Sequence, residues 1–310
     1  MIEVEELRKV YAGGVEAVKG IALEVAAGEV FGLLGPNGAG KSTTIGMLTA
    51  TIRPTSGSAR LAGFDVVDQP LAARRVSSVV FQEAVVDRSL SGRRNLELHG
   101  QLWGVEPKSA RERIDELIEM VGLRELVDRQ VGTYSGGERR RLEIARALVS
   151  SPRVLFLDEP TVGLDPRIRA ELLNVIADLR SRSELTILVT THYLDEAERL
   201  CDRVAIMHSG EIVALDTPER LLAGLGRELV ELRVEGDASA ALASLRSVGI
   251  AHENAFTVGA TVTVPLNGHS SGEAIAAIHE LGLAEAVSAR RPTLDDVYLR
   301  LTGGRLAEAA

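Results

Sequence analysis

Cysteine and aromatic residues are scarce in this chain of 310 residues. The single cysteine, Cys201, cannot form a disulfide bond within the chain, which excludes a disulfide framework and fits a reducing compartment. Aromatic residues make up only 3%, but apolar residues together reach 45%, which is enough for a globular protein with a substantial core. The length allows one large domain or two smaller ones.

The chain also lacks long apolar runs and an excess of positive charge. No apolar stretch approaches about 20 residues, the length of a membrane-spanning helix, so we expect another chain to provide any membrane part. Residues 1–6 are acidic and alternating, which does not fit a signal peptide. The net charge is −9, and Arg139–Arg141 is the one conspicuous basic block. This balance argues against nucleic acid as the main partner.

A glycine-rich loop is the most informative feature that is present. The pattern G-x-x-x-x-G-K-[ST], which binds nucleotide phosphates, is met by Gly35, Pro36, Asn37, Gly38, Ala39, Gly40, Lys41, Ser42 and Thr43. Glycines let backbone N–H groups approach an anion, while Lys41 supplies a charge for the β- and γ-phosphates and Ser42 a hydroxyl for Mg²⁺. The apolar run 30–34 predicts a buried parallel strand before the loop, and residues 43–48 predict a helix after it.

Residues up to about Pro218 alternate apolar strand-like runs with helical patterns, which predicts an α/β fold with a mostly parallel sheet. The runs 2–4 and 21–25 alternate with period two instead, and predict antiparallel strands with one solvated face. Residues from about 90 to 129 have a helical pattern throughout and predict a helical insertion. Further strands are expected at 154–157, 186–189, 204–207 and 211–214.

A second unit is expected to begin near residue 225. Its strand and helix patterns follow the order β-α-β-β-α-β, which suggests a small ferredoxin-like sandwich. The segment Thr293–Gly303 predicts a capped terminal helix. Its apolar stripe consists of Leu294, Val297, Tyr298 and Leu301. The stripe fits a helix that seals the small unit and also a regulatory contact. We expect it to be buried within the tail's own sheet, with a dimer or partner contact on the remaining face.

Two carboxylates, Asp158 and Glu159, directly follow the apolar run 154–157. A buried parallel strand would place both at its carboxyl end, where ligands bind in open α/β sheets. Asp158 suits Mg²⁺, which prefers oxygen ligands, and Glu159 suits orienting or deprotonating an attacking water. Alone, these residues could equally be a core strand that leaves into an acidic turn. The phosphate loop upstream favours the metal and catalytic interpretation.

The segment Ser135–Glu138 begins another predicted helix. Its S-x-x-E spacing is that of a capping box. The same helix start would present a hydroxyl and two unobstructed glycine amides, which could form a second anion site. By itself the segment favours the capping interpretation.

The phosphate loop, the helix start Ser135–Glu138 and the strand end Leu157–Pro160, in this order and spacing, resemble the ATP-binding cassette (ABC) ATPases. The resemblance covers about residues 1–220. It implies a P-loop NTPase fold of the ABC type, with a mostly parallel sheet, an antiparallel β subdomain and a helical subdomain. We expect an ATPase domain over 1–224 with its helical subdomain at about 83–134, and a small C-terminal α+β accessory domain over 225–310.

The resemblance also implies roles for single residues. Tyr11 matches an aromatic residue that stacks on adenine, although alone it would be a strand-edge tyrosine. Gln82 matches a glutamine that meets Mg²⁺ and the attacking water and links to the membrane partner. Asp165 matches a loop that crosses a dimer interface, and His192, otherwise an ordinary strand-end histidine, matches the switch histidine on the γ-phosphate. The implied sets are catalytic (Glu159, His192, Gln82), metal-binding (Ser42, Gln82, Asp158) and ATP-binding (Tyr11, Gly35–Thr43, Ser135, Gly136, Gly137, Glu138, Asp165).

The helix start departs from the family pattern Leu-Ser-Gly-Gly-Gln at two positions. Tyr134 replaces Leu and keeps the apolar bulk. Glu138 replaces Gln, which puts a carboxylate near a bound γ-phosphate and should repel it. Arg139–Arg141 could offset this repulsion, and a capping role would keep Glu138 folded toward its own helix. We expect modest affinity for a closed dimer.

Within the family, the segments 140–148, 161–166 and 293–303 look like those of drug and antibiotic exporters of the daunorubicin-resistance type. This similarity implies a subunit that binds and hydrolyses ATP with Mg²⁺. It further implies an ATP-dependent head-to-tail homodimer, separate integral-membrane permease subunits, and a place at the cytoplasmic face of the cell membrane.

Two alternatives belong to other functional classes. ABC ATPases of translation or DNA maintenance carry two cassettes, long coiled coils or zinc clusters, and the sequence has none of these. A transporter ATPase could instead move a polysaccharide, a lipid or an imported solute, which the terminal segment disfavours without excluding.

Overall fold

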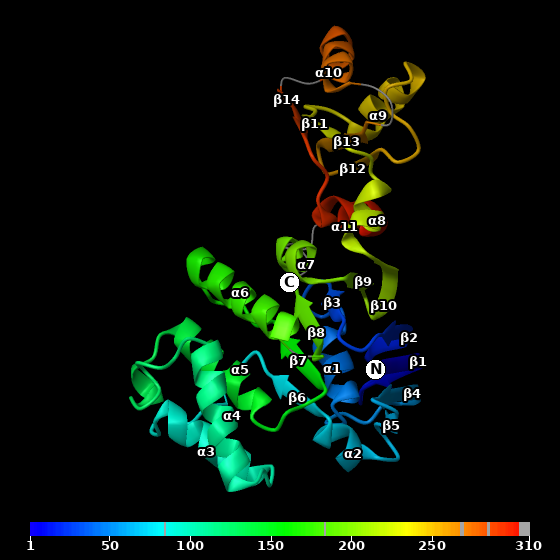
Figure 1. The fold of residues 1–310 in the computed structure, drawn as a ribbon. Coiled ribbons are helices and arrows are strands. Elements are labelled where there is room, and N and C mark those ends of the chain that lie inside the picture. Colours follow the sequence, from blue (N-terminus) through cyan, green and yellow to red (C-terminus); the bar gives the residue numbers. More distant parts are fainter. Residues whose placement is uncertain (84, 183, 267–269, 284–285, 304–310) are drawn as a thin grey trace.

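The protein is described here by a computed structural model, which covers residues 1–83, 85–182, 184–266, 270–283 and 286–303. Figure 1 shows a central sheet with helices on one side and a smaller sheet on the other, and a separate small sheet with two helices beyond them. The α/β fold with parallel and antiparallel sheets is confirmed. Among the described residues, no helix is both long and apolar enough to cross a membrane.

The central sheet has the strand order β10-β9-β3-β8-β7-β6. Its strands are β3 (Val30–Leu34), β6 (Ser77–Val80), β7 (Val154–Asp158), β8 (Thr186–Thr191), β9 (Arg203–His208) and β10 (Glu211–Asp216). All neighbours pair in parallel except β9 and β10, which form an antiparallel hairpin. Every residue of β3, β7 and β8 is buried, as expected for strands covered on both faces. The carboxyl ends of these strands therefore lie at one edge.

An antiparallel sheet covers one face of the central sheet. It consists of β1 (Ile2–Val10), β2 (Glu16–Val25), β4 (Ser56–Leu61) and β5 (Phe64–Asp65). In β1 the side chains of Ile2, Val4 and Leu7 are buried. They join a cluster with α1 (Lys41–Leu48) and with β3. The two antiparallel strands expected near the N-terminus are thus confirmed, with one face on the core.

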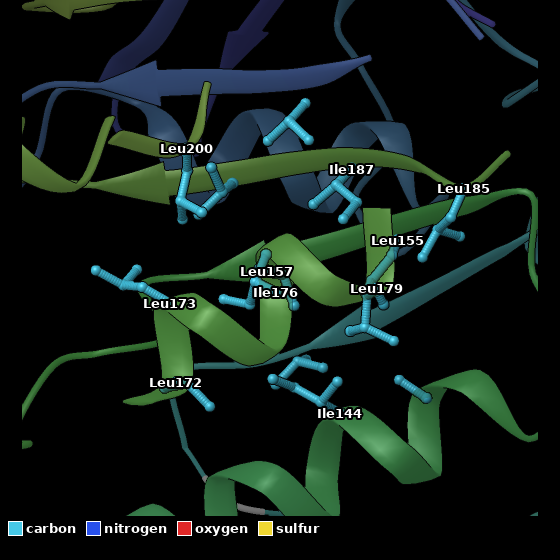
Figure 2. Packing of buried hydrophobic residues seen from close by; sticks show 14 of the residues in the cluster. Ile144, Leu155, Leu157, Leu172, Leu173, Ile176, Leu179, Leu185, Ile187 and Leu200 are labelled. Atoms are coloured by element: carbon cyan, nitrogen blue, oxygen red, sulfur yellow. The ribbon is translucent and has the colours of Figure 1, made fainter. Parts of the chain in front are cut away.

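Helices cover the opposite face. They are α3 (Gly92–Leu102), α4 (Pro107–Met120), α5 (Gly136–Leu148), α6 (Pro166–Arg182) and α7 (Leu194–Leu200), with α2 (Pro70–Arg75) at the edge and a short 3₁₀ turn at Val131–Thr133. Figure 2 shows Ile176 and Leu179 of α6 close to the sheet residues Leu155 and Leu157, and these side chains belong to one buried cluster with Ile144 of α5. This layer positions the start of α5 beside the start of α6.

The expectation of helix throughout residues 90–129 is wrong in part. Helix α4 ends at Met120, and residues 121–130 form turns before the 3₁₀ segment. Gly122 has φ +68°, the left-handed conformation that glycine adopts readily and that closes many helices. The apolar residues Leu123 and Val127 beyond it are buried, but they belong to the turns.

The tail forms the expected β-α-β-β-α-β unit. Its elements are β11 (Leu229–Arg233), α9 (Ala238–Ser247), β12 (Phe256–Val258), β13 (Thr261–Pro265), α10 (Ser271–Glu280) and β14 (Ala286–Arg290). The sheet is antiparallel with the order β12-β13-β11-β14. Val230, Leu232 and Val262 form a core of the tail's own with Leu245 of α9 and Ile278 of α10. A ferredoxin-like arrangement is therefore present.

The terminal helix α11 (Leu294–Thr302) is not buried within the tail's sheet, so that expectation is wrong. Leu294, Val297 and Tyr298 belong to the large cluster that also contains Leu200 of α7. The reason is that α9 and α10 already fill the tail's core, so the stripe of α11 packs on α7 and on α8 (Pro218–Ala223) instead (Figure 1). Leu301, expected in the stripe, is 45% exposed.

Polar contacts fix α11 to both parts of the chain. The Leu294 N–H donates to Glu198 Oε1 at 2.8 Å, and the Tyr298 hydroxyl lies 2.9 Å from His208 Nδ1. Arg290 of β14 pairs with Asp296 at 2.7 Å and with Glu231 of β11 at 2.6 Å. The helix therefore joins the tail sheet to the first part of the chain.

We expect Leu294→Ala to destabilise the whole protein by about 2–4 kcal/mol, since it leaves a cavity in a shared core. Thermal or urea unfolding followed by two probes, one in each part of the chain, measures the effect. Leu301→Ala is the matched control on the same helix and should change stability by less than about 0.5 kcal/mol. Unfolding of the tail alone, with the first part unchanged, would contradict the shared core.

Candidate functional site

The candidate site lies where β3, β8 and β7 end, because these neighbouring parallel strands share one carboxyl edge. The loops that follow them carry Gly35–Gly40, His192 and Glu159. Open α/β sheets bind ligands at this edge. The structure thus brings the glycine-rich loop together with two sequence-predicted residues that lie more than a hundred positions further along the chain.

The glycine-rich loop runs from β3 into α1 and has the backbone that a phosphate cradle needs. Gly40, just before the helix, has φ +105°, and a Cβ there would lie 2.5 Å from the Ala17 carbonyl oxygen. Only glycine fits this position. The first helical residue is Lys41, so the unpaired N–H groups of the helix start face the loop. The loop is therefore an anion site built from backbone donors.

Lys41 is held over this loop. Its side chain is 4% exposed, and its Nζ donates to the carbonyl oxygens of Gly35 at 2.7 Å and Pro36 at 3.0 Å. The same Nζ lies 3.1 Å from Glu159 Oε1. The ammonium is thus buried at the mouth of the loop, where an anion can compete for it against carbonyl oxygens and one carboxylate.

Asp158 and Ser42 meet as the metal prediction requires. The Ser42 hydroxyl donates to Asp158 Oδ1 at 3.3 Å, and the Thr190 hydroxyl donates to the same oxygen at 2.7 Å. A carboxylate and a hydroxyl at this separation form an oxygen donor set that fits Mg²⁺. Thr190 orients the carboxylate, and the sequence analysis did not identify it because one threonine at a strand end carries no signal.

Glu159 has an unusual backbone. Its φ is +47°, which costs a non-glycine residue about 1–3 kcal/mol and is found mostly where a function requires it. Its N–H donates to Thr190 Oγ1 at 2.9 Å, and the side chain is 7% exposed. The carboxylate lies between Lys41 and His192, whose Nδ1 is 3.4 Å from Oε2. The predicted base is therefore buried between the phosphate loop and the predicted switch histidine.

His192 lies between the candidate site and the buried side chain of Glu196. Its ring stacks at 4.2 Å on Tyr193, over which the Arg169 guanidinium lies at 3.7 Å. The neighbouring Thr191 hydroxyl donates to Glu196 Oε2 at 2.9 Å. Burial raises the pKa of Glu196, and this hydrogen bond opposes the rise. The loop after β8 is thus held by stacking and by one buried carboxyl group.

The structure also places Tyr11 and Gln82 at this edge. The Tyr11 hydroxyl lies 3.3 Å from Thr43 Oγ1, and the Lys9 Nζ lies over its ring at 5.1 Å. The residue is 39% exposed, which leaves part of the ring open to a base beside the loop. Gln82 is exposed and follows β6, whose last residue Val80 pairs with Leu157 of β7. Gln82 therefore lies at the same edge as Asp158.

The remaining predicted residues form a second group around the starts of α5 and α6. The Ser135 N–H donates to Glu138 Oε2 at 2.7 Å and the Glu138 N–H to Ser135 Oγ at 3.3 Å, so the capping box is confirmed. Asp165 Oδ1 accepts from the N–H groups of Arg167 and Ile168 and caps α6. A Cβ on Gly137 would lie 2.2 Å from Ile168 Cγ2. Hence the two helix starts pack together.

Arg140 was missed by the sequence analysis, which treated Arg139–Arg141 only as a counterweight to Glu138. Its side chain is 8% exposed and donates to the carbonyl oxygens of Asp158, Glu159 and Pro160. The signal was available: Arg140 follows buried Gly137 by three residues and precedes buried Ile144 by four, so it occupies the core-facing stripe of α5.

A cavity of about 530 Å³ lies beside Gln82, between β6 and the helical layer. Its lining includes Ser77, Phe81, His99, Trp103 and Arg146. Phe81 and Trp103 are each 38% exposed, so two aromatic side chains face solvent at one spot. Exposed aromatic residues beside a hollow are typical of surfaces that bind another protein.

Comparison with known proteins agrees with this geometry. A family model described as ABC transporter matches residues 18–162. The daunorubicin resistance ATP-binding protein DrrA3 of Streptomyces coeruleorubidus is 42% identical, over 100% of this chain and 98% of that protein. The structure of cbiO1 from Clostridium perfringens, part of the ABC transporter complex cbiONQ, matches with TM-score 0.67 and 27% identity over 79% of this chain and 94% of that one. The dimeric cassette MJ0796 bound to ADP and Pi matches with TM-score 0.62 and 26% identity, over 70% and 98%.

His99 in the lining of this cavity predicts that the free energy of unfolding depends on pH. Burial, reinforced by Arg146, lowers the pKa of His99 to about 4. The unfolded chain protonates this group near its ordinary pKa of about 6.5 and the folded chain does not, so the free energy of unfolding should fall as pH falls from about 6.5 to 4. His99→Gln should flatten this slope in urea titrations across the window. The exposed His279→Gln is the control, and an equal slope in both variants would contradict the assignment.

Proposed function

The chain belongs to the ATP-binding proteins of ABC transporters, and we propose that it is the nucleotide-binding subunit of an efflux pump for drugs or antibiotics. ATP hydrolysis is the reaction of this family. The observation that carries the proposal is the contact at 3.1 Å between Lys41 and Glu159, because it joins the phosphate-binding loop to the carboxylate suited to activate water.

ATP would bind at the loop Gly35–Thr43. The backbone N–H groups of the loop and of the α1 start would receive the phosphates, and Lys41 would exchange its carbonyl partners for phosphate oxygens. The exposed face of Tyr11 would support the adenine. Ser42 and Asp158 would hold Mg²⁺, which supplies charge neutralisation at the phosphates when bound.

Glu159 would act as the base toward the attacking water. Its carboxylate is already directed into the site by the backbone bend at φ +47° and by the hydrogen bond from its N–H to Thr190. His192 lies within 3.4 Å and would contact the γ-phosphate side of the site. Gln82, at the same strand edge, would meet the metal and the water. Most of the rate would come from positioning and charge stabilisation.

A second copy of the chain would complete each site head to tail. The group Ser135–Glu138 and Asp165 lies around the starts of α5 and α6, away from the loop of its own chain, and is partly exposed. The dimeric similarity to MJ0796 supports association of two cassettes. Because Glu138 is bound to its own helix start, it would present the helix N–H groups rather than its charge to the partner's ATP.

Separate integral-membrane permease subunits would dock at the cavity beside Gln82. The exposed side chains of Phe81 and Trp103 offer apolar surface there, and Phe81 directly precedes the predicted contact glutamine. The match to cbiO1, part of a transporter complex, supports such a partner. The protein would then work at the cytoplasmic face of the cell membrane.

Export of drugs is supported by the full-length similarity to a daunorubicin resistance protein. This similarity includes the tail as well as the nucleotide site, and it gives no support to the alternative of a polysaccharide, lipid or import system. We further propose the division into an ATPase domain (1–224, with its helical subdomain at about 83–134) and an accessory domain (225–310). Residues 304–310 of the latter lie outside the described part of the chain.

Lys41→Ala tests the ATPase assignment. Loss of the ammonium leaves the phosphate charge uncompensated, so nucleotide binding should weaken strongly and phosphate release should fall by about 10²–10³-fold or more. In cells that carry the permease partner, drug resistance should disappear with it. The exposed Lys108→Ala is the control and should behave like the unchanged protein. Near-normal turnover by Lys41→Ala would overturn the whole assignment.

Glu159→Gln should separate binding from chemistry. The amide keeps the size but cannot accept the proton, so hydrolysis should drop by about 10²–10⁴-fold while ATP still binds. The variant should accumulate as an ATP-dependent dimer in size-exclusion chromatography. A monomer in saturating ATP, even when the permease subunits are present, would contradict the head-to-tail arrangement.

A further inference from the structure

The Arg140 side chain connects three segments of the active-site edge. A guanidinium has five N–H donors, and here all five have acceptors. Nε donates to Pro160 O at 2.7 Å, while one terminal nitrogen donates to Asp158 O at 3.2 Å and Glu159 O at 3.1 Å. The other terminal nitrogen donates to the Phe81 carbonyl oxygen and, at 3.0 Å, to Glu143 Oε2.

The three successive carbonyl oxygens of Asp158, Glu159 and Pro160 converge on this one cation. An extended strand cannot do this, because its carbonyl groups alternate in direction. The left-handed backbone of Glu159, at φ +47°, turns the chain so that they can converge. The guanidinium therefore stabilises the same bend that directs the Glu159 carboxylate toward Lys41.

Glu143 extends the connection to the loop that carries Gln82. Its side chain is only 1% exposed, Oε2 pairs with Arg140, and Oε1 accepts the N–H of Val85 at 2.7 Å. Arg140 itself holds the carbonyl of Phe81 on the other side of Gln82. Phe81 and Val85 are thus both tied to one buried ion pair on α5.

Arg140 has no contact with the phosphate loop among the interactions of the described residues. Its charge is balanced at 3.0 Å by Glu143, so direct stabilisation of phosphate charge is a poor explanation for its burial. What the side chain holds in place is backbone: the residues on either side of Glu159 and the residue before Gln82.

We propose that Arg140 is a positioning residue that sets the direction of the Glu159 carboxylate and ties it mechanically to the Gln82 loop. The inference rests on the proposed role of Glu159 as the base. Movement of Phe81 and Val85, on either side of Gln82, is transmitted through Arg140 and Glu143 to the backbone of Glu159. A contact made by a partner beside Gln82 can in this way alter the rate of hydrolysis without touching ATP.

Arg140→Gln tests this on the full-length protein. Single-turnover release of labelled phosphate should slow by about 10²-fold, the effect of misplacing a catalytic group by about 1 Å. The Kd for ATP should stay within about twofold, because an interaction that matters only for chemistry changes kcat and not ground-state binding. Arg140→Lys should recover part of the rate, since lysine keeps the charge and up to three donors but lacks the planar fork.

Arg180→Gln is the control. Arg180 lies on α6 and pairs with Asp202 at 2.5 Å, away from the carbonyl groups of residues 158–160. This change removes the same chemical group from the helical layer, and the rate should stay near that of the unchanged protein. A slowing by Arg180→Gln equal to that by Arg140→Gln would overturn the proposal.

The decisive measurement combines Arg140→Gln with Glu159→Gln. If Arg140 acts through Glu159, the second change should add almost no loss to the first, because residues that act as a unit are not additive. The same fold-loss in both backgrounds, or a parallel loss of ATP affinity, overturns the proposal. If thermal unfolding shows that Arg140→Gln does not fold, Arg140→Lys carries the same cycle. Unchanged hydrolysis by Glu159→Gln alone would instead refute the proposed base.

Discussion

The active-site edge depends on the hydroxyl of Thr190, which joins two neighbouring parallel strands at the point where they end. It donates to Asp158 Oδ1 at 2.7 Å and accepts the Glu159 N–H at 2.9 Å. Both carboxylates are nearly buried, and buried carboxylates need such partners to be held in place. One hydroxyl thus fixes the proposed metal-binding carboxylate and the backbone of the proposed base together. The full burial of β7 and β8 is what makes this alignment rigid.

The tail is coupled to this edge through packing. Helix α11 contributes Tyr298, 1% exposed, to the core shared with α7, and its hydroxyl meets His208 at the end of β9. Two residues later, the N–H of Gly210 donates to the Ala39 carbonyl oxygen of the phosphate loop at 3.1 Å. A short covalent and hydrogen-bonded connection therefore runs from the terminal helix to the nucleotide loop. The position of α11 depends on contacts with both the tail and the first part of the chain. The sequence alone therefore could not show which part buries its apolar stripe.

The sequence predicted the residues whose chemistry is encoded in local spacing. The loop with Lys41, the strand end with Asp158 and Glu159, and the capping box of Ser135 and Glu138 depend on neighbours within a few residues, and each is found as expected. Thr190 was not predicted, because one threonine at a strand end carries no local signal. Arg140 was missed because its partners lie in distant segments, although its spacing along α5 put it on the core-facing stripe. The end of α4 was missed for a different reason: apolar residues continue past Gly122, but the glycine stops the helix.

The two groups of residues that are predicted to bind ATP differ in burial and in hydrogen bonding. This difference bears on how the ATPase reaction of the family is controlled. The group at the phosphate loop is buried and densely hydrogen-bonded, with Lys41 4% exposed. The group at the start of α5 is partly exposed, and the carboxylate of Glu138 is hydrogen-bonded to the start of its own helix. The group at the phosphate loop is preorganised, and the group at the start of α5 caps its own helix. Neither group is therefore stabilised much by local rearrangement. If two chains close around ATP as proposed above, the gain in stability would come from that closure and not from movement within either group. Arg140 lies between the two groups. Its helix α5 begins at the partly exposed group, and its guanidinium donates a hydrogen bond to the carbonyl oxygen of Glu159. Contact at the outer end of α5 is therefore connected by one helix turn to the backbone that carries the base.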